Sequence, residues 1–276
     1  MLAFPNCKIN LGLNITGKRA DGYHNIETIF YPVQLNDVLE IIESPAGVDV
    51  NFSASGNPVD GDEKDNLCIK AFYLLKKDFP QLPSVKIHLH KTIPMGAGLG
   101  GGSSDAAFAL VMLNKKFSLK LSAEQLLSYA LALGSDCPFF IINQPCVATG
   151  RGEIMEPVNI SLTGYYLVLV NPGIHINTGW AFGQLNNMVN GHLATTSLQT
   201  DILQPINCWK DNLVNDFEEP VFEKYPAIKM IKTTLYNNGA LFAGMSGSGS
   251  TVFGIYDKKI CITDLPVNYY IRTVLL

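Results

Sequence analysis

Residues 94–107 read Pro-Met-Gly-Ala-Gly-Leu-Gly-Gly-Gly-Ser-Ser-Asp-Ala-Ala, with five glycines among the seven residues from 96 to 102. Before this stretch, residues 85–90 alternate apolar and polar side chains like a half-buried strand. After it, residues 106–113 are a run of good helix formers. A strand, a glycine loop and a helix start are together typical of a phosphate site. Glycine lets an anion approach backbone N–H groups, and the first helical turn has N–H donors without partners.

The residues that follow the glycines add further hydrogen-bonding groups. Ser103 and Ser104 are expected to cap the helix start and to offer hydroxyls to a phosphate. Asp105 is expected in the first turn, and Lys115 and Lys116 in the last turn, where the helix dipole favours these charges. We therefore predict that the loop binds phosphate.

Three other interpretations of the loop fit less well. A flexible linker would be polar, whereas this one contains Met95 and Leu99 and leads into an apolar helix. Gly96, Gly98 and Gly101 match the dinucleotide pattern, but the region about 20 residues further on leads into another helix and has no acidic strand end. A Walker loop is excluded because no Lys-Ser or Lys-Thr follows the last glycine.

Length, charge and hydropathy restrict the class of protein. With 276 residues, of which 47% are hydrophobic, the chain can form one large or two medium domains. A net charge of -4 argues against a nucleic-acid partner. No apolar run is long enough for a membrane span. The N-terminal residues lack the pattern of a signal peptide, so a cytoplasmic protein is expected.

The cysteines and two histidines predict no metal or disulfide chemistry. The six cysteines are scattered among apolar neighbours without a C-x-x-C pair, which is typical of buried free thiols in a cytoplasmic protein. His88 and His90 are expected on the solvated face of a strand, where metal binding is the less favoured interpretation. The cysteines are Cys7, Cys68, Cys137, Cys146, Cys208 and Cys261.

Strands and helices mix along the chain without strict alternation, which favours an α+β fold over a doubly wound sheet. Surface loops are expected over residues 53–65 and 186–200. Ser122 and Gln125 predict a capping box, and Gly134 predicts the end of the same helix. Helices are expected over residues 66–77, 106–113, 122–133 and 226–236. Strands are expected over residues 9–15, 26–33, 38–42, 48–52, 85–90, 147–152, 165–170, 241–243 and 251–256.

Four further segments contain candidate functional residues. Lys8 and Asn10 share one face of the first strand, where a lone lysine usually points to solvent. In the turn over residues 17–24, Tyr23 could stack on a planar ring and His24 could recognise its edge. Asp136 is at an expected helix start, either as an N-cap or as a functional carboxylate. Residues 243–250 form a second glycine-rich turn, which is either a plain hairpin or backbone that approaches a ligand.

Two of these segments and the first glycine loop together resemble the motifs of the GHMP small-molecule kinases, named after galactokinase, homoserine, mevalonate and phosphomevalonate kinases. They are Lys8-Ile9-Asn10-Leu11, Pro94-x3-Gly98-Leu99-Gly100-x2-Ser103-Ser104 and Gly244-Met245-Ser246-Gly247-Ser248-Gly249. The resemblance extends from Lys8 to about Tyr256. Two positions depart from it mildly, with Ala97 where glycine is common and Asp105 where asparagine is common.

One branch of these kinases is more similar than the others. It acts on a cytidine diphosphate-linked methylerythritol in the non-mevalonate isoprenoid pathway. The similar segments are Gly100-Gly101-Gly102-Ser103-Ser104, Arg19-Ala20-Asp21-Gly22-Tyr23-His24 and Gly134-Ser135-Asp136-Cys137-Pro138-Phe139-Phe140.

The resemblance implies an α+β fold of two domains, over residues 1–155 and 156–276, with the active site in the cleft between them. It implies ATP-dependent phosphorylation of the substrate's 2-hydroxyl, giving ADP and the 2-phosphate, with ATP and Mg2+ as cofactors. The implied partners are the small-molecule substrate and ATP, with no nucleic acid and no membrane. The protein is expected to be a monomer or a homodimer.

The resemblance also implies roles for individual residues. Asp136 would be the general base, and Lys8 would keep that carboxylate ionised and stabilise charge as the phosphoryl group moves. The implied substrate-binding residues are Asn10, Tyr23, His24 and Phe182. The implied ATP-binding residues are Pro94, Met95, Gly96, Ala97, Gly98, Leu99, Gly100, Gly101, Gly102, Ser103 and Ser104.

Two alternatives stay open. One is another GHMP kinase, of the homoserine or mevalonate type, which the turn over residues 19–24 disfavours because those enzymes have no cytosine to stack. The other is a catalytically silent nucleotide-binding relative, which the presence of both Lys8 and Asp136 disfavours.

Overall fold

A computed structural model describes residues 1–45, 47–59, 61–185 and 197–276 of the chain. They fall into two compact units, each assembled from separate stretches of sequence. Unit 1 consists of Met1–Cys7, Gln34–Met95 and Gly100–Asn143, and unit 2 of Lys8–Val33, Gly96–Leu99 and Gln144–Leu276. The predicted domain boundary near residue 155 cuts the chain once, whereas the two compact units are each assembled from several stretches. The two divisions are of different kinds, so the boundary stays a prediction.

In the described residues the strands form three four-stranded sheets, in the orders β1-β4-β6-β5, β2-β3-β7-β8 and β10-β11-β9-β12. The first sheet belongs to unit 1, and the other two belong chiefly to unit 2. Most neighbouring strands are antiparallel, and β5 and β6 are parallel. The strands are β1 (Leu2–Ala3), β2 (Asn6–Lys18), β3 (His24–Asn36), β4 (Val38–Glu43), β5 (Val50–Gly56), β6 (Val85–Lys91), β7 (Cys146–Thr149), β8 (Ile154–Pro157), β9 (Tyr166–Asn171), β10 (Phe242–Met245), β11 (Val252–Tyr256) and β12 (Tyr270–Leu275).

Four of the described helices have eleven residues or more: α1, α2 and α3 in unit 1 and α9 in unit 2. The other described helices are shorter. The α-helices are α1 (Leu67–Asp78), α2 (Gly101–Lys116), α3 (Ala123–Leu133), α4 (Cys137–Ile142), α5 (Thr178–Leu185), α6 (Leu198–Asp201), α7 (Trp209–Asn212), α8 (Glu218–Lys224) and α9 (Pro226–Asn237). The 3-10 helices are η1 (Glu63–Asp65) and η2 (Ile206–Cys208).

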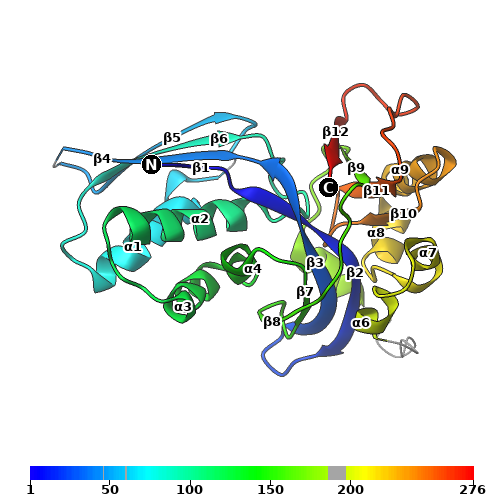
Figure 1. Ribbon diagram of the computed structural model, residues 1–276, viewed down its shortest axis with the longest axis horizontal. Helices are drawn as coiled ribbons and strands as arrows, with labels where there is room; N and C mark the ends of the chain where they lie inside the picture. Colours follow the sequence, from blue (N-terminus) through cyan, green and yellow to red (C-terminus); the bar gives the residue numbers. More distant parts are fainter. Residues whose placement is uncertain (46, 60, 186–196) are drawn as a thin grey trace. The chain divides into compact units, whose positions relative to one another are not determined.

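In unit 1, helices cover one face of the sheet β1-β4-β6-β5 (Figure 1). Leu39 and Ile41 of β4 pack in one buried cluster with Leu110 and Leu113 of α2, and all four side chains are fully buried. Burial of each such side chain stabilises the unit by about 1.5–3 kcal/mol. This core fixes α2, and with it the glycine loop that precedes α2.

The other face of this sheet is polar where β5 and β6 pair. His88 is half-buried and His90 is exposed, as predicted for the solvated face. The side chains of Ser53 and His88 share a hydrogen bond of 2.8 Å across the two strands. β5 extends to Gly56, so the loop expected over residues 53–65 is wrong for its first four residues. These four residues are Ser-Ala-Ser-Gly, a composition typical of loops, yet their backbone pairs with β6.

In unit 2, α8 and α9 lie beside the sheet β10-β11-β9-β12 (Figure 1). Val168 and Val170 of β9 share a buried cluster with Ile228 and Ile231 of α9. Antiparallel pairing of β10 and β11 confirms the predicted strands on both sides of the second glycine turn. The loop expected over residues 186–200 lies largely outside the described residues, and its described end is helical, since Ser197 caps α6.

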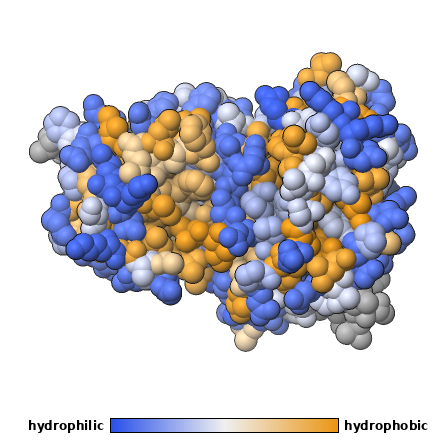
Figure 2. Space-filling model, in the orientation of Figure 1, coloured by the Kyte–Doolittle hydropathy of each residue, from blue (hydrophilic) through white to orange (hydrophobic). Residues whose placement is uncertain are grey.

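All six cysteines are free thiols, but the predicted burial is wrong for two of them. Cys208 is half-buried and Cys261 is exposed. On the face shown in Figure 2, hydrophilic residues occur throughout and hydrophobic residues lie among them. Within the described part of the chain, no helix has the length and apolar character needed to cross a membrane.

Candidate functional site

The glycine loop enters α2 through left-handed backbone. Gly96, Gly98 and Gly100 have φ of 59°, 79° and 70°, values that favour glycine. Gly100 is the N-cap and α2 begins at Gly101. No side chain caps this end, so the capping predicted for Ser103 and Ser104 is wrong. The N–H groups of the first turn are therefore left for a ligand.

The early start of α2 changes the position of Asp105. The helix begins five residues before the predicted range, so Asp105 lies beyond the first turn and the prediction for it is wrong. Ser104 is fully buried, and no described residue provides a hydrogen-bond partner for its Oγ atom. The glycine at the N-cap explains the error, because cap rules based on Ser, Thr, Asp and Asn do not detect it.

The two glycine turns lie against each other within unit 2. A Cβ atom on Gly98 would lie 2.0 Å from the carbonyl oxygen of Ser246, so no side chain fits there. Ser246 Oγ donates a hydrogen bond of 2.8 Å to the Gly98 carbonyl, and Thr251 N donates one of 3.2 Å to the Ala97 carbonyl. The second turn is thus more than a plain hairpin, because it positions Gly98 and its neighbours.

Lys8 points into this arrangement. The sequence favoured a solvent-facing lysine, but only 3% of Lys8 is exposed. Its Nζ atom donates hydrogen bonds of 2.6 Å to Asn10 Oδ1 and 3.2 Å to the Gly98 carbonyl. The ammonium also lies 5.0 Å from the centre of the Phe30 ring. A buried ammonium points to function, because charge is rarely buried without a reason.

Asn10 holds Lys8 in this position. Its Nδ2 atom donates a hydrogen bond of 2.8 Å to Thr28 Oγ1, while its Oδ1 atom accepts from Lys8. Its backbone N–H donates to Ser246 Oγ at 3.2 Å. Contact between Asn10 and a substrate stays a prediction.

Asp136 precedes α4, as predicted. It is half-buried and occupies the N-cap position, yet its side chain makes no capping hydrogen bond. The predicted N-cap position of Asp136 is therefore confirmed, but its side chain does not cap α4. Asp136 belongs to unit 1 and Lys8 to unit 2, so their joint action stays a prediction.

The predicted ring-binding residues Tyr23, His24 and Phe182 all belong to unit 2. His24 is the first residue of β3, and its ring stacks on the ring of Phe182 with centroids 5.0 Å apart and planes 11° apart. Only 7% of His24 is exposed, and no described residue is a hydrogen-bond partner of its Nε2 atom. Tyr23 is 57% exposed, and the Arg151 guanidinium lies 4.9 Å from its ring centre. Sequence reasoning missed Arg151, which lies in the turn between β7 and β8 and has no pattern of its own.

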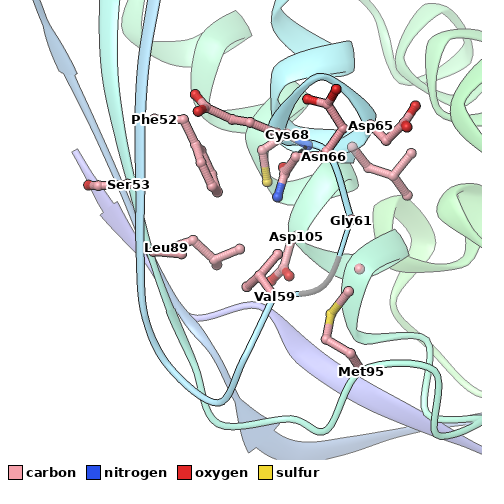
Figure 3. A pocket seen from close by; sticks show the side chains of 15 residues that line it. Phe52, Ser53, Val59, Gly61, Asp65, Asn66, Cys68, Leu89, Met95 and Asp105 are labelled. Atoms are coloured by element: carbon pink, nitrogen blue, oxygen red, sulfur yellow. Dashed lines mark hydrogen bonds between the residues drawn. The ribbon is translucent and has the colours of Figure 1, made fainter. Parts of the chain in front are cut away.

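A cavity of about 340 Å³ opens in unit 1 beside the start of α2. Its walls are largely apolar, and Gly102 and Asp105 of α2 form part of them. Asn66, Cys68 and Asp105 surround the same space in Figure 3. Sequence reasoning missed this cavity, because its lining residues are scattered between Phe52 and Asp105. The lining residues are Phe52, Ser53, Ala54, Val59, Gly61, Asp62, Glu63, Asp65, Asn66, Leu67, Cys68, Leu89, Met95, Gly102 and Asp105.

Behind the cavity lies a buried ion cluster that the sequence did not predict. Lys91 Nζ donates to Asp105 Oδ2 at 2.7 Å and also to Asp37 Oδ2. The three residues come from β6, α2 and the residue between β3 and β4, so no local pattern joins them. The described residues contain no group of three or more His, Cys, Asp or Glu side chains placed to hold a metal ion.

Comparisons with known proteins agree with this geometry. Residues 66–144 match the model of the GHMP kinases N terminal domain, and residues 201–260 match that of the GHMP kinases C terminal domain. The chain is 50% identical to the 4-diphosphocytidyl-2-C-methyl-D-erythritol kinase of Bacteroides fragilis over 100% of both chains. It is 51% identical to the kinase of the same name from Cytophaga hutchinsonii, over 94% of this chain and 93% of the other.

Solved structures show the same relationship. A crystal structure of 4-(cytidine 5'-diphospho)-2C-methyl-D-erythritol kinase matches with a TM-score of 0.77 at 30% identity, over 92% of this chain and 90% of that one. The Methanococcus jannaschii mevalonate kinase matches with a TM-score of 0.70 at 12% identity, over 100% and 98%, which shows the fold alone. The resemblance drawn from the three motifs is confirmed. The chain therefore belongs to the GHMP kinases and, within them, to the 4-diphosphocytidyl-2-C-methyl-D-erythritol kinase family.

Proposed function

We propose that this chain transfers the γ-phosphoryl group of ATP to the 2-hydroxyl of 4-diphosphocytidyl-2-C-methyl-D-erythritol, giving ADP and the 2-phosphate. The observation that carries the kinase proposal is the uncapped first turn of α2, which follows a glycine loop and adjoins a cavity. The substrate is proposed from relatives of that name with about half of their residues identical over their full lengths.

The nucleotide fits the start of α2 in two parts. The phosphates would bind the N–H groups of the first turn, where the helix dipole favours negative charge. The base would enter the cavity, whose apolar lining includes Phe52, Leu89 and Met95. Gly102 belongs to both, since it lies in the first turn of α2 and lines the cavity. The ATP-binding role of residues 94–104 thus stays a proposal supported by this arrangement.

Asp136 would take the proton from the substrate hydroxyl, and Lys8 would stabilise charge on the moving phosphoryl group. The support for Lys8 is an ammonium buried on a strand and held by hydrogen bonds to Asn10 Oδ1 and the Gly98 carbonyl. The support for Asp136 is a half-buried carboxylate that is not used for capping. Positioning and charge neutralisation supply most of the catalysis in phosphoryl transfer.

The cytosine ring would bind near His24, Phe182 and Tyr23. The support is the unpartnered Nε2 atom of His24, since a buried ring nitrogen without a partner costs about 1–3 kcal/mol unless a ligand satisfies it. Phe182 fixes the plane of the His24 ring by stacking. Tyr23 has an exposed aromatic ring, and the Arg151 guanidinium lies next to this ring.

Mg2+ would neutralise the phosphate charges and polarise the γ-phosphoryl group. Magnesium is usually bound through substrate phosphates with few protein ligands, so we assign it to the nucleotide and to no particular side chain. We also propose that the protein is cytoplasmic, supported by six free thiols, and that it is a monomer or a homodimer.

A coupled assay of ADP release tests the function. Purified protein is supplied with ATP, Mg2+ and either the cytidine substrate, mevalonate or homoserine. We expect ADP release with the cytidine substrate only, and phosphorus NMR should place the new phosphate on the 2-oxygen. Turnover of mevalonate or homoserine alone would refute the substrate, and an absence of turnover with all three would refute the kinase proposal.

A further inference from the structure

The side chain of Asn215 holds the second glycine turn. Asn215 lies between α7 and α8 and is buried. Its Nδ2 atom donates hydrogen bonds of 2.8 Å to the carbonyl of Met245 and of 2.8 Å to the carbonyl of Gly247. Its Oδ1 atom accepts a hydrogen bond of 3.0 Å from Phe217 N. Both N–H bonds of the amide are thus used on one turn of the backbone.

The backbone around Asn215 is fixed to β2, the strand that contains Lys8. Leu13 N donates a hydrogen bond of 2.8 Å to the Val214 carbonyl, and Asp216 N donates one of 2.9 Å to the Leu13 carbonyl. These two bonds flank Asn215, which forms an isolated parallel bridge with Leu13. The amide of Asn215 therefore connects the second glycine turn to a defined point of β2.

A buried carboxylate holds the same end of the turn. Glu218 Oε1 accepts a hydrogen bond of 2.8 Å from Met245 N, so Glu218 and Asn215 bind the N–H and the carbonyl of one residue. Within the turn, Gly247 and Gly249 have φ of 56° and 90°. Glycine permits these values but does not enforce them. The hydrogen bonds from outside the turn are therefore needed to fix its conformation.

The turn positions two of the groups that bind Lys8. Ser246 is the residue between the two carbonyls that Asn215 holds. Its Oγ atom donates a hydrogen bond of 2.8 Å to the Gly98 carbonyl and accepts one of 3.2 Å from Asn10 N. The Gly98 carbonyl and Asn10 Oδ1 both accept hydrogen bonds from Lys8 Nζ. A displacement of the turn therefore moves acceptors that orient the ammonium.

We propose that Asn215 is a positioning residue for phosphoryl transfer, which acts through the second glycine turn on the ammonium of Lys8. All residues in this series of contacts belong to unit 2. Phosphoryl transfer depends on positioned charge, and a displacement of about 1 Å lowers a rate by up to about 10²-fold. The inference rests on the proposed role of Lys8 in the reaction.

Steady-state kinetics of Asn215→Leu test this proposal. Leucine has a similar volume but donates no hydrogen bond to the two carbonyls. We expect kcat to fall by about tenfold or more, with the KM values for ATP and for the cytidine substrate within about threefold of those of the natural chain. The kcat should fall and the KM values should not, because Asn215 orients a charge and touches neither substrate.

Asn114→Leu is the matched control. Asn114 of α2 also uses its amide to hold backbone, since it binds the N–H and the carbonyl of Leu121. Both residues belong to unit 1. We expect Asn114→Leu to lower the melting temperature and to leave kcat within about twofold of that of the natural chain.

A double-mutant cycle with Lys8→Met separates positioning from a general loss of structure. Without the ammonium, Asn215→Leu should change kcat by less than about twofold. A role of Asn215 in stability alone would lower kcat by the same factor in both backgrounds, and that result would overturn the inference. A folded Asn215→Leu protein with the kcat of the natural chain would also overturn it.

Two further measurements keep the outcomes distinct. If Asn215→Leu does not fold, Asn215→Ala takes its place in the same cycle, because the smaller side chain leaves room for water at the two carbonyls. An unchanged kcat in Lys8→Met would overturn the role of Lys8 and, with it, this inference. An absence of ADP release by the natural chain would overturn the proposed function itself.

Discussion

Asp136 and Lys8 have surroundings that decide what their substitution does. Asparagine has the same shape as aspartate and Asp136 makes no capping hydrogen bond, so Asp136→Asn should keep α4 folded. If Asp136 is the base, kcat should fall by about 10²-fold or more, as the loss of proton transfer typically costs. Thermal melting measures the effect on folding, and steady-state kinetics measure the effect on kcat. Turnover within a few-fold of the natural enzyme would contradict the assignment.

Lys8→Met tests the other half of the proposed pair. Methionine keeps most of the buried volume but leaves Asn10 Oδ1 and the Gly98 carbonyl without the ammonium. We expect a fall in kcat of a similar order to that in Asp136→Asn, about 10²-fold, since charge stabilisation of the transition state is lost. Thermal melting controls for folding. A change confined to ATP affinity would place Lys8 on the nucleotide instead.

Tyr23 tests the cytidine site. Stacking of one base typically contributes about 1–3 kcal/mol, so Tyr23→Ala should raise the KM for the cytidine substrate by about 5- to 150-fold and leave the KM for ATP nearly unchanged. Tyr73→Ala is the matched control, because Tyr73 is 48% exposed and Tyr23 57%. Equal damage to both substrates would show that Tyr23 supports the fold and that cytidine binds elsewhere.

At the scale of helices and strands, the sequence predicted those features that depend on residues close together in the chain. The capping box of Ser122 and Gln125 is present in α3, because both of its hydrogen bonds are local. The start of α2 was missed because a left-handed glycine serves as N-cap. β12 was missed because its burial is slight and its pairing with β9 joins residues about 100 positions apart. The Lys91 cluster had no local pattern for the same reason.

Substitutions of Gly98 and Gly102 distinguish a structural role of the glycine-rich segment from a ligand-binding role. Gly98→Ala would place a Cβ atom 2.0 Å from the Ser246 carbonyl, at a positive φ, and should destabilise the protein by about 2 kcal/mol or more. A Cβ atom on Gly102 has no neighbour within 4 Å, so Gly102→Ala should keep or raise the melting temperature.

The two glycine variants should differ in nucleotide binding as well. If phosphate binds the first turn of α2, Gly102→Ala should raise the KM for ATP about tenfold or more, because the added Cβ atom holds the phosphate away from the N–H groups and weakens charge-assisted hydrogen bonds. Melting curves and ATP kinetics of both variants check this pair. An unchanged KM in a stable Gly102→Ala protein would show that the phosphates bind elsewhere.

At the scale of the whole molecule, the family and its α+β class could be predicted from three short motifs, since phosphoryl transfer requires phosphate-binding backbone and charged groups at defined places. The assembly of each unit from separate stretches could not. β2 contains residues of both units, and the glycine loop does so as well, because Pro94 and Met95 belong to unit 1 and Gly96–Leu99 to unit 2. A segment that passes from one unit to the other is determined by long-range contacts. No change in local composition indicates where this happens.

The pH dependence of global stability follows from the same buried cluster. Burial raises the pKa of Asp105 from 3.8 to about 7, so the folded chain keeps a proton that the unfolded chain releases between these values. Asp105 therefore stabilises the fold fully below about pH 4, and this contribution is lost as the pH rises to about 7, by at most about 1.4 kcal/mol per pH unit. Urea unfolding of the natural chain and of Asp105→Asn from about pH 4 to about pH 8 measures it, since other groups cancel in the difference to first order. We expect the natural chain to lose stability relative to Asp105→Asn up to about pH 7 and to show a constant difference above it. A relative gain over that range would mean that Asp105 is ionised in the fold and that the proton resides elsewhere.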